Sequence, residues 1–181
     1  MEFRTQRLFC RPLRESDKQI YCFLYTDTEV MRKISNPISI QSAEKNFQKA
    51  LMNNANKPFA QLSWAIEEIQ TSRIIGIKGF RWHHSGASET EIGMMLVPEA
   101  QGMRYAVEGL GALVDYGFKY LSLRRIFAQY NVGHLASENL VKRLGFTVLP
   151  DIIDTLYGST KRCEIHAQNW QACEITRAIV S

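Results

Sequence analysis

The sequence predicts an α+β fold in which a mixed, mostly antiparallel sheet is flanked by helices, within one domain that spans residues 1–181. Three observations predict this class. Strand-like runs separated by short polar turns fill the middle of the chain, and a helix–strand–helix–strand order follows them. The length of 181 residues, with 45% hydrophobic and 22% charged residues, suits a single globular core, and no Pro/Gly-rich linker divides it.

The first third of the chain is predicted to contain one strand and three helices. Residues 8–13 have the pattern of a short strand, and residues 15–34 carry apolar side chains at helical spacing, which predicts two short helices. Serine is a preferred residue at helix N-termini, so a third helix is expected to run from an N-cap at Ser42 to the polar residues 53–56.

Three strands are predicted next. Residues 62–69 and 74–82 alternate between apolar and polar side chains, and the short polar segment between them is typical of an antiparallel hairpin. A third strand is expected over residues 91–97, because Pro98 ends that run.

The spacing of apolar residues then changes to that of a helix. Apolar side chains recur every three or four positions over residues 103–121, which predicts an amphipathic helix of about five turns. A strand over residues 125–130 and a helix that includes residues 140–144 follow. Residues 146–149 and 163–170 are predicted to be late strands that pair with each other.

Composition and charge argue against several classes of protein. Lysine and arginine number 22 against 18 acidic residues, for a net charge of +4, and the densest basic groups are only pairs, so nucleic-acid binding is not expected as a primary role. The four cysteines form no Cys-x-x-Cys pair and no histidine stands at metal-finger spacing, so no metal is expected. The sequence has no apolar signal core and no apolar run of membrane length, which predicts a cytoplasmic protein without a membrane partner.

The segment from Glu91 to Ala106 carries the strongest functional signal. A strand stops at Pro98, a short loop follows, and a long helix begins near Met103. The first N–H groups of a helix have no partner within it, and with the positive end of the helix dipole they form a site for an anion such as a phosphate. Gly102 lets a ligand approach the backbone closely. From these residues alone, a plain connection whose glycine only shapes the turn is the alternative.

Three stretches of the chain resemble one family. Gln101 and Ala106 match the ends of the Gln/Arg-x-x-Gly-x-Gly/Ala cofactor loop of the GNAT superfamily of N-acetyltransferases. The longer string over residues 91–108 is similar to the RimJ/RimL branch, which acetylates protein N-termini among other amines. The opening residues 5–17 and the element over residues 137–146 resemble the same branch, in the same order.

The resemblance implies a GNAT-like sheet in which two splayed strands hold acetyl-CoA, with no metal. It implies that the acetyl group passes directly to a primary amine, on a protein N-terminus or a small molecule, and that a homodimer is a candidate assembly. The residues implied for cofactor binding belong to the strand backbone, the loop amides and the end of the next strand: Met94, Met95, Leu96, Gln101, Gly102, Met103, Arg104, Tyr105, Ala106 and Asn131.

Four side chains are candidates for proton transfer. Glu91 begins the splayed strand beside the expected thioester, so it is the first candidate general base, with an exposed strand-end carboxylate as the alternative. His83 and His84 in the adjoining turn are second candidates, because histidine titrates near neutral pH. Ser137 matches a serine of the branch that protonates the departing thiolate, or else it caps a helix.

Two positions depart from the family pattern. Arg104 stands where the central loop glycine is expected, and its side chain either crowds the pyrophosphate or turns outward and pairs with it. His134 stands where the branch has asparagine. Arg104 motivates a second hypothesis, a GNAT-fold module that has lost turnover and serves as a binding or regulatory protein. Trp64 and Trp82 are expected either to line the acceptor site or to lie in the core.

Overall fold

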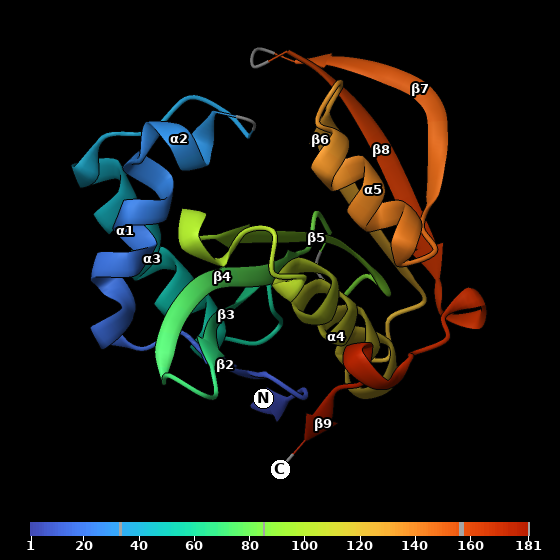
Figure 1. Cartoon of the computed structure of the whole chain (residues 1–181), viewed down its shortest axis with the longest axis horizontal. Helices are drawn as coiled ribbons and strands as arrows, with labels where there is room; N and C mark the ends of the chain where they lie inside the picture. The colour runs from blue at the N-terminus through green and yellow to red at the C-terminus, as the bar shows by residue number, and fades with distance from the viewer. Residues whose placement is uncertain (33, 85, 156–157, 181) are drawn as a thin grey trace.

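The computed structural model describes residues 1–32, 34–84, 86–155 and 158–180 (Figure 1). The strands are β1 (Phe3–Arg4), β2 (Leu8–Pro12), β3 (Gln61–Glu68), β4 (Arg73–Arg81), β5 (Glu89–Leu96), β6 (Arg125–Asn131), β7 (Thr147–Thr155), β8 (Gly158–His166) and β9 (Ile179–Val180). The helices are α1 (Lys18–Thr26), α2 (Thr28–Met31), α3 (Ile40–Ala55), α4 (Tyr105–Tyr120) and α5 (Leu135–Arg143). Short 3-10 turns span Glu15–Asp17, Pro98–Ala100, Ala167–Asn169 and Glu174–Thr176.

The strands form one nine-stranded sheet in the order β7-β8-β6-β5-β4-β3-β2-β1-β9. Neighbouring strands run antiparallel except β5 and β6, which are parallel. The parallel pair lies near the middle of the sheet and joins two antiparallel halves. The predicted α+β class with a mixed, mostly antiparallel sheet is therefore confirmed.

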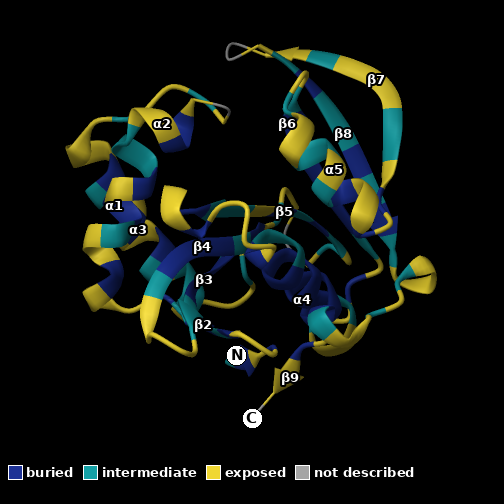
Figure 2. Cartoon of the chain, in the orientation of Figure 1, coloured by how far each residue is buried: buried dark blue, intermediate teal, exposed yellow. Residues whose placement is uncertain are grey.

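Helices cover both faces of the sheet. α1 packs against β4 and α3 against β3 on one face, whereas α4 packs against β2, β4 and β5 on the other (Figure 1). α4 is buried along most of its length (Figure 2). Beneath it, Trp64 is fully buried among the rings of Phe3, Phe80 and Tyr116, so the interpretation of Trp64 as a core residue is confirmed.

Most elements lie where the sequence predicts them, and the differences are at their ends. α3 begins at Ile40 because Ser39 is its N-cap: the Ser39 hydroxyl oxygen accepts the Ser42 N–H at 3.2 Å. The prediction of Ser42 as the cap is therefore wrong. α4 begins at Tyr105 rather than near Met103. β1 and β9 were not predicted, because two residues carry no periodic signal.

The late strands are longer than the sequence indicates. β7 and β8 pair with each other, as predicted, and the described part of the hairpin reaches Thr155 and Gly158. Its register shifts between Val148 and Ile152, and the intervening Leu149, Pro150 and Asp151 interrupt the alternation on which the sequence prediction depends. The expected extension of the last strand to residue 170 is wrong, because β8 ends at His166 and a 3-10 turn follows.

The segment after β8 is attached to α4 by a buried carboxylate. Asp115 accepts hydrogen bonds from the Trp170 indole N–H at 3.0 Å and from the Ala178 backbone N–H at 2.9 Å. It also pairs with Lys119, whose Nζ lies 2.9 Å from the carboxylate. Asp115 therefore joins both ends of the C-terminal segment to α4.

We predict that Asp115→Ala lowers the free energy of unfolding by about 2–4 kcal/mol, because the Trp170 and Ala178 N–H groups lose their acceptor. Lys119→Gln is the control, since it breaks only a partly exposed ion pair and should cost less than about 1 kcal/mol. Urea denaturation followed by circular dichroism measures both variants. Equal losses in the two would contradict the prediction.

Candidate active site

The parallel strands β5 and β6 separate after a short stretch of pairing (Figure 1). Their register joins Glu89 to Arg125 and Glu91 to Phe127 and goes no further, whereas β5 stays paired with β4 as far as Leu96. Beyond Glu91, the edge of β5 that faces β6 has no strand partner among the described residues. The splayed strand pair expected from the resemblance is present.

The free edge of β5 exposes the backbone of alternate residues. The Val97 N–H donates to the Ile75 carbonyl at 2.9 Å, and residues along an antiparallel strand direct their backbone groups to the two sides in turn. The backbone groups of Met95 are thus directed to β4, and those of Met94 and Leu96 to the free edge. Of the three strand residues that the sequence singles out, only Met95 has its backbone engaged in the sheet.

The loop between β5 and α4 contains a run of unpaired backbone amides. Gln101 is not part of that run, because its N–H donates to the Pro98 carbonyl at 3.1 Å. The first hydrogen bond of α4 joins the Glu108 N–H to the Arg104 carbonyl. Within the described ranges, no acceptor is found for the N–H groups of Gly102, Met103, Arg104, Tyr105, Ala106 and Val107. Amides in this arrangement, at the positive end of a helix, bind anions.

Arg104 adopts the backbone conformation that the family pattern assigns to glycine. Its φ is 63°, in the left-handed region, which costs a residue with a side chain about 1–2 kcal/mol. Gly102, two residues earlier, is also left-handed, with a φ of 81°. The Arg104 side chain is exposed and has no hydrogen bond or ion pair to the part of the chain that the structure describes. Its exposure favours the outward orientation over crowding of the amides.

An ion pair between the buried Glu108 and the partly exposed Arg7 fixes the entrance to α4. Glu108 is fully buried and accepts hydrogen bonds from the Thr5 hydroxyl at 2.6 Å, the Arg7 backbone N–H at 2.8 Å and Arg7 Nε at 2.7 Å. Arg7 Nη1 also donates to the Met103 carbonyl at 3.1 Å. Arg7 therefore connects the carboxylate in the first turn of α4 with the loop that precedes the helix.

Tyr105 anchors the same loop to the β3–β4 hairpin. Its hydroxyl donates a hydrogen bond to Glu68, which raises the pKa of Tyr105, and Glu68 also accepts the Thr71 hydroxyl at 2.6 Å. The Arg7 guanidinium lies over the Tyr105 ring, 4.4 Å from its centroid. The opening segment of the chain and the loop before α4 are thus in direct contact through Arg7.

Glu91 lies at the point where β5 and β6 separate, with 19% of its side chain exposed. Its Oε2 is 3.0 Å from Arg81 Nη2 and 3.0 Å from His83 Nε2. The His83 ring stacks on the Phe127 ring with centroids 5.7 Å apart, which holds the imidazole against the carboxylate. The His84 side chain is exposed and is not hydrogen-bonded to Glu91.

His134 caps α5 in place of the asparagine of the family pattern. Its ring Nδ1 accepts the Ser137 N–H at 3.1 Å, so Ser137 is not the cap and that alternative is wrong. Ser137 is half-buried in the first turn of α5. Asn131 ends β6, and its carbonyl accepts the His134 N–H at 3.0 Å, which joins the strand to the helix.

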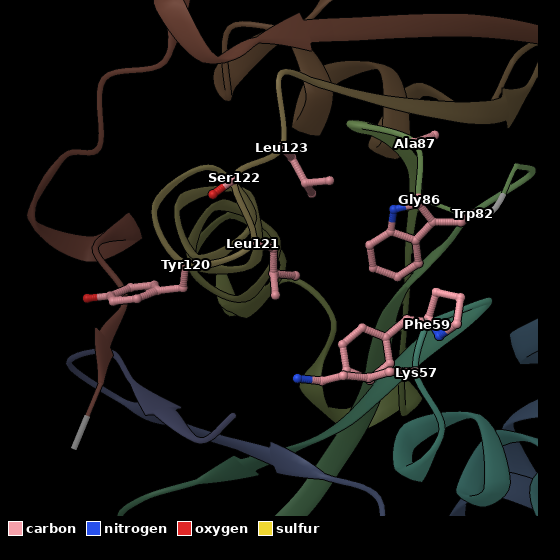
Figure 3. A pocket seen from close by; sticks show the side chains of 10 residues that line it. Lys57, Phe59, Trp82, Gly86, Ala87, Tyr120, Leu121, Ser122 and Leu123 are labelled. Carbon is pink, nitrogen blue, oxygen red and sulfur yellow. The ribbon is translucent and has the colours of Figure 1, made fainter.

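A separate pocket of about 660 Å³ lies at the other end of α4 (Figure 3). Phe59, Trp82, Tyr120 and Leu123 are among the residues that line it. The 16 residues of α4 separate this pocket from the loop before Tyr105 by about 24 Å. Trp82 therefore lines a pocket at the opposite end of α4 from the loop amides.

The described ranges contain neither a metal-binding cluster nor a membrane-spanning helix. Within them, no group of three or more His, Cys, Asp or Glu side chains is placed to hold a metal ion. No helix of the same ranges combines the length and the apolar character needed to cross a bilayer.

The chain belongs to the GNAT acetyltransferase family, whose acetyltransferase (GNAT) domain matches residues 7–147. The uncharacterized N-acetyltransferase YoaA of Bacillus subtilis is 30% identical over 144 residues, which cover 78% of this chain and 80% of the relative. A spermidine N-acetyltransferase from Vibrio cholerae, solved in complex with CoA and spermine, has a TM-score of 0.80 at 21% identity and covers 91% of this chain and 98% of its own. An acetyltransferase from Agrobacterium tumefaciens has a TM-score of 0.77 at 25% identity, over 92% and 94% of the two chains.

Within this family, the chain is an acetyl-CoA-dependent N-acetyltransferase. The free edge of β5 and the amides before α4 fit that donor chemically. A strand edge can pair with an extended chain that contains amide groups, and helix N-terminal amides bind phosphate groups. Both features lie next to each other, because the loop that carries the amides follows directly from β5.

Proposed function

We propose that this enzyme transfers the acetyl group of acetyl-CoA directly to a primary amine in a ternary complex, at the point where β5 and β6 separate. One observation carries the proposal: the free edge of β5 after Glu91 continues into the unpaired amides from Gly102 to Ala106. Pantetheine is long enough to follow a strand edge while the diphosphate reaches a helix N-terminus. Acetyl-CoA supplies an acetyl group already activated as a thioester.

We assign the binding residues from the same geometry. The backbone groups of Met94 and Leu96 pair with pantetheine, and one of their N–H groups polarises the thioester carbonyl. The amides from Gly102 to Ala106 receive the diphosphate, and the exposed guanidinium of Arg104 is available to pair with a phosphate. Asn131 faces the pantetheine or adenosine portion from the end of β6.

Glu91 and Ser137 move the protons. Attack requires a neutral amine, and Glu91 accepts the proton that the amine loses as the C–N bond forms, directly or through water. His83, 3.0 Å from that carboxylate, can pass the proton to solvent. The Ser137 hydroxyl donates a proton to the sulfur as the C–S bond breaks. Because the thiolate of coenzyme A is a fair leaving group without help, the contribution of Ser137 is small.

Release of free thiol from acetyl-CoA in the presence of a panel of amines tests the function. The panel includes peptides with a free N-terminus, amino acids, amino sugars and polyamines. Absence of release with every amine, from a protein that binds acetyl-CoA, would contradict turnover at this site. The RimJ/RimL-like branch, the protein N-terminus as acceptor, the single domain, the homodimer and the cytoplasmic location stay predictions from the sequence.

We predict that the protein binds acetyl-CoA and that Arg104→Gly changes the affinity less than about tenfold, because Arg104 already has the backbone conformation of glycine. Isothermal titration calorimetry measures both proteins. The alternative, a GNAT-fold module that has lost turnover, predicts no binding by the wild type and recovery in Arg104→Gly. That pair of results would rule out the enzyme proposed here.

We predict that Arg7→Gln lowers kcat/KM for acetyl-CoA by about tenfold or more, which corresponds to about 1.4 kcal/mol, because the loop amides lose their support at Met103. The same variant should leave kcat/KM for S-acetylpantetheine nearly unchanged, since that donor lacks the diphosphate. Arg4→Gln is the control, because Arg4 is an exposed arginine near the same end of the chain. Equal losses with both donors would indicate a general loss of structure instead.

We predict that Glu91→Gln lowers kcat about 100-fold with the acceptor that the panel identifies, because the proton of the amine loses its acceptor. Glu89→Gln is the matched control: Glu89 lies two residues away on the same strand face, but it pairs with Arg125. Steady-state kinetics over a range of pH measures both variants. A fall in kcat of the same size in Glu89→Gln would argue against a specific role for Glu91.

A further inference from the structure

The face of the sheet opposite α4 carries charged side chains around one aromatic ring. Strand register aligns Arg81, Glu91, Phe127 and Glu164 in one row across β4, β5, β6 and β8. Neighbouring side chains of the same face complete the group. We call it the Phe127 cluster, and its members are Arg81, His83, Glu89, Glu91, Arg125, Phe127, Arg162 and Glu164.

Every carboxylate of the Phe127 cluster already has a cationic partner. Glu91 is paired as described above. Arg125 binds Glu89 at 2.6 Å and Glu164 at 2.9 Å, and the hydrogen bond to Glu89 raises the pKa of Arg125. The cluster therefore keeps no carboxylate for a further positive charge.

Arg162 is the cation of the cluster that has no ion pair with any described residue. Its guanidinium lies over the Phe127 ring, 5.4 Å from the centroid, and its Nε is buried without a hydrogen-bond acceptor. A buried N–H without an acceptor is rare and costs stability until some group supplies one. The ring positions the guanidinium, and its Nη groups, which are neither buried nor paired with any described residue, are available to an acceptor from outside the chain.

Arg162 lies beyond the separation of β5 and β6, across from the expected place of the acceptor amine. Gly93, two residues after Glu91, is exposed, and a Cβ there would meet no atom within 4 Å, so the space above it is open. β8 runs antiparallel to β6, so the step from Glu164 to Arg162 points the same way along the sheet as the step from Glu91 to Gly93 on β5. Arg162 and Glu164 lie on the same face of β8, because they are two residues apart. An acceptor whose amine lies beside Glu91 and whose body lies over Gly93 therefore extends toward Arg162.

We propose that the acceptor carries a carboxylate or a similar anionic group close to its primary amine, and that Arg162 binds this group. The inference rests on the proposed function, because it takes Glu91 to face the reacting amine. A guanidinium binds a carboxylate through two parallel N–H···O bonds, and here it does so without breaking an existing pair. Free α-amino acids and peptides with an acidic residue next to the N-terminus share this chemistry.

The same cluster disfavours a polyamine. A second ammonium group over Gly93 would face the Arg162 guanidinium, and each carboxylate of the Phe127 cluster is already engaged. The second ammonium group and the Arg162 guanidinium would repel each other, and no unpaired carboxylate of the cluster offsets this repulsion. The Vibrio cholerae spermidine N-acetyltransferase shares the fold at 21% identity, which says nothing about the acceptor of this chain.

Matched acceptors test the proposal. Amino acids are compared with their α-carboxamides, peptides with glutamate at the second position are compared with the glutamine analogues, and spermidine is the dicationic acceptor. We expect kcat/KM to be about 10- to 100-fold higher for the carboxylate member of at least one pair, the range of a charge-assisted hydrogen bond. The pair that shows the effect distinguishes amino acid from peptide. Calorimetric binding of the same amines in the presence of CoA gives a readout independent of turnover.

Arg162→Gln is expected to make the members of each pair nearly equal in kcat/KM and in affinity, and Arg162→Lys to restore part of the difference. Lys161→Gln is the matched control. Lys161 is the adjacent cation, but its side chain is on the opposite face of β8 and lies 3.9 Å from Glu138. This control should keep the full preference for the carboxylate.

Three results would overturn the inference. The first is an equal kcat/KM for the carboxylate and carboxamide acceptors with the wild-type enzyme, and the second is a higher kcat/KM for spermidine. Either result would leave the proposed transferase activity intact. A preference that survives in Arg162→Gln would remove Arg162 from the recognition. Absence of acetylation with every amine would instead contradict the proposed function. In that case, equal calorimetric affinities for the carboxylate and carboxamide amines would contradict the inference about Arg162 as well.

Discussion

The separation of β5 from β6 is the constraint on which the whole site depends. A strand edge that loses its partner leaves N–H and C=O groups that need water or a ligand. Here each strand keeps a second partner, because β4 pairs with β5 as far as Leu96 and β8 pairs with β6 from Arg125 to Asn131. The sheet is therefore open between the two strands without a loss of either one, and the open edge is held rigidly from both sides.

The loop before α4 is held in a different way, by side chains from the start of the chain. A carboxylate in the first turn of a helix is favoured by the helix dipole, and Glu108 is buried there with Thr5 and Arg7 as its donors. Glu108 is fully buried, whereas 43% of the Arg7 side chain is exposed, so loss of Arg7 would leave a buried carboxylate with fewer hydrogen-bond donors. Because Arg7 also holds the Met103 carbonyl, the loop cannot move freely without disturbing that pair. Its amides are thus arranged before any anion arrives.

The longer strands, the long helix and the loop could be predicted because each has a local signal, such as hydrophobic periodicity or the glycine at position 102. The contact between Arg7 and Glu108 could not, since the two residues are 101 positions apart and charged residues normally indicate a solvated surface. Arg162 gives no sequence signal for the same reason. The N-cap of α3 was wrongly predicted at Ser42 because Ser39 and Ser42 are both residues that cap helices well. Only the backbone conformation shows that the helix begins after Ser39.

The two departures from the family pattern show why residue type alone is a weak guide to this site. Arg104 keeps the left-handed backbone of a glycine, and His134 keeps the capping role of an asparagine through its ring nitrogen. The groups proposed to bind the donor are mainly backbone amides, so a change of side chain matters only where it alters the path of the backbone. Recognition of the acceptor is more sensitive to substitution, because we propose that it depends on side chains such as Arg162. For this reason the charges of the Phe127 cluster, and not the shared fold, carry the information about which amine is acetylated.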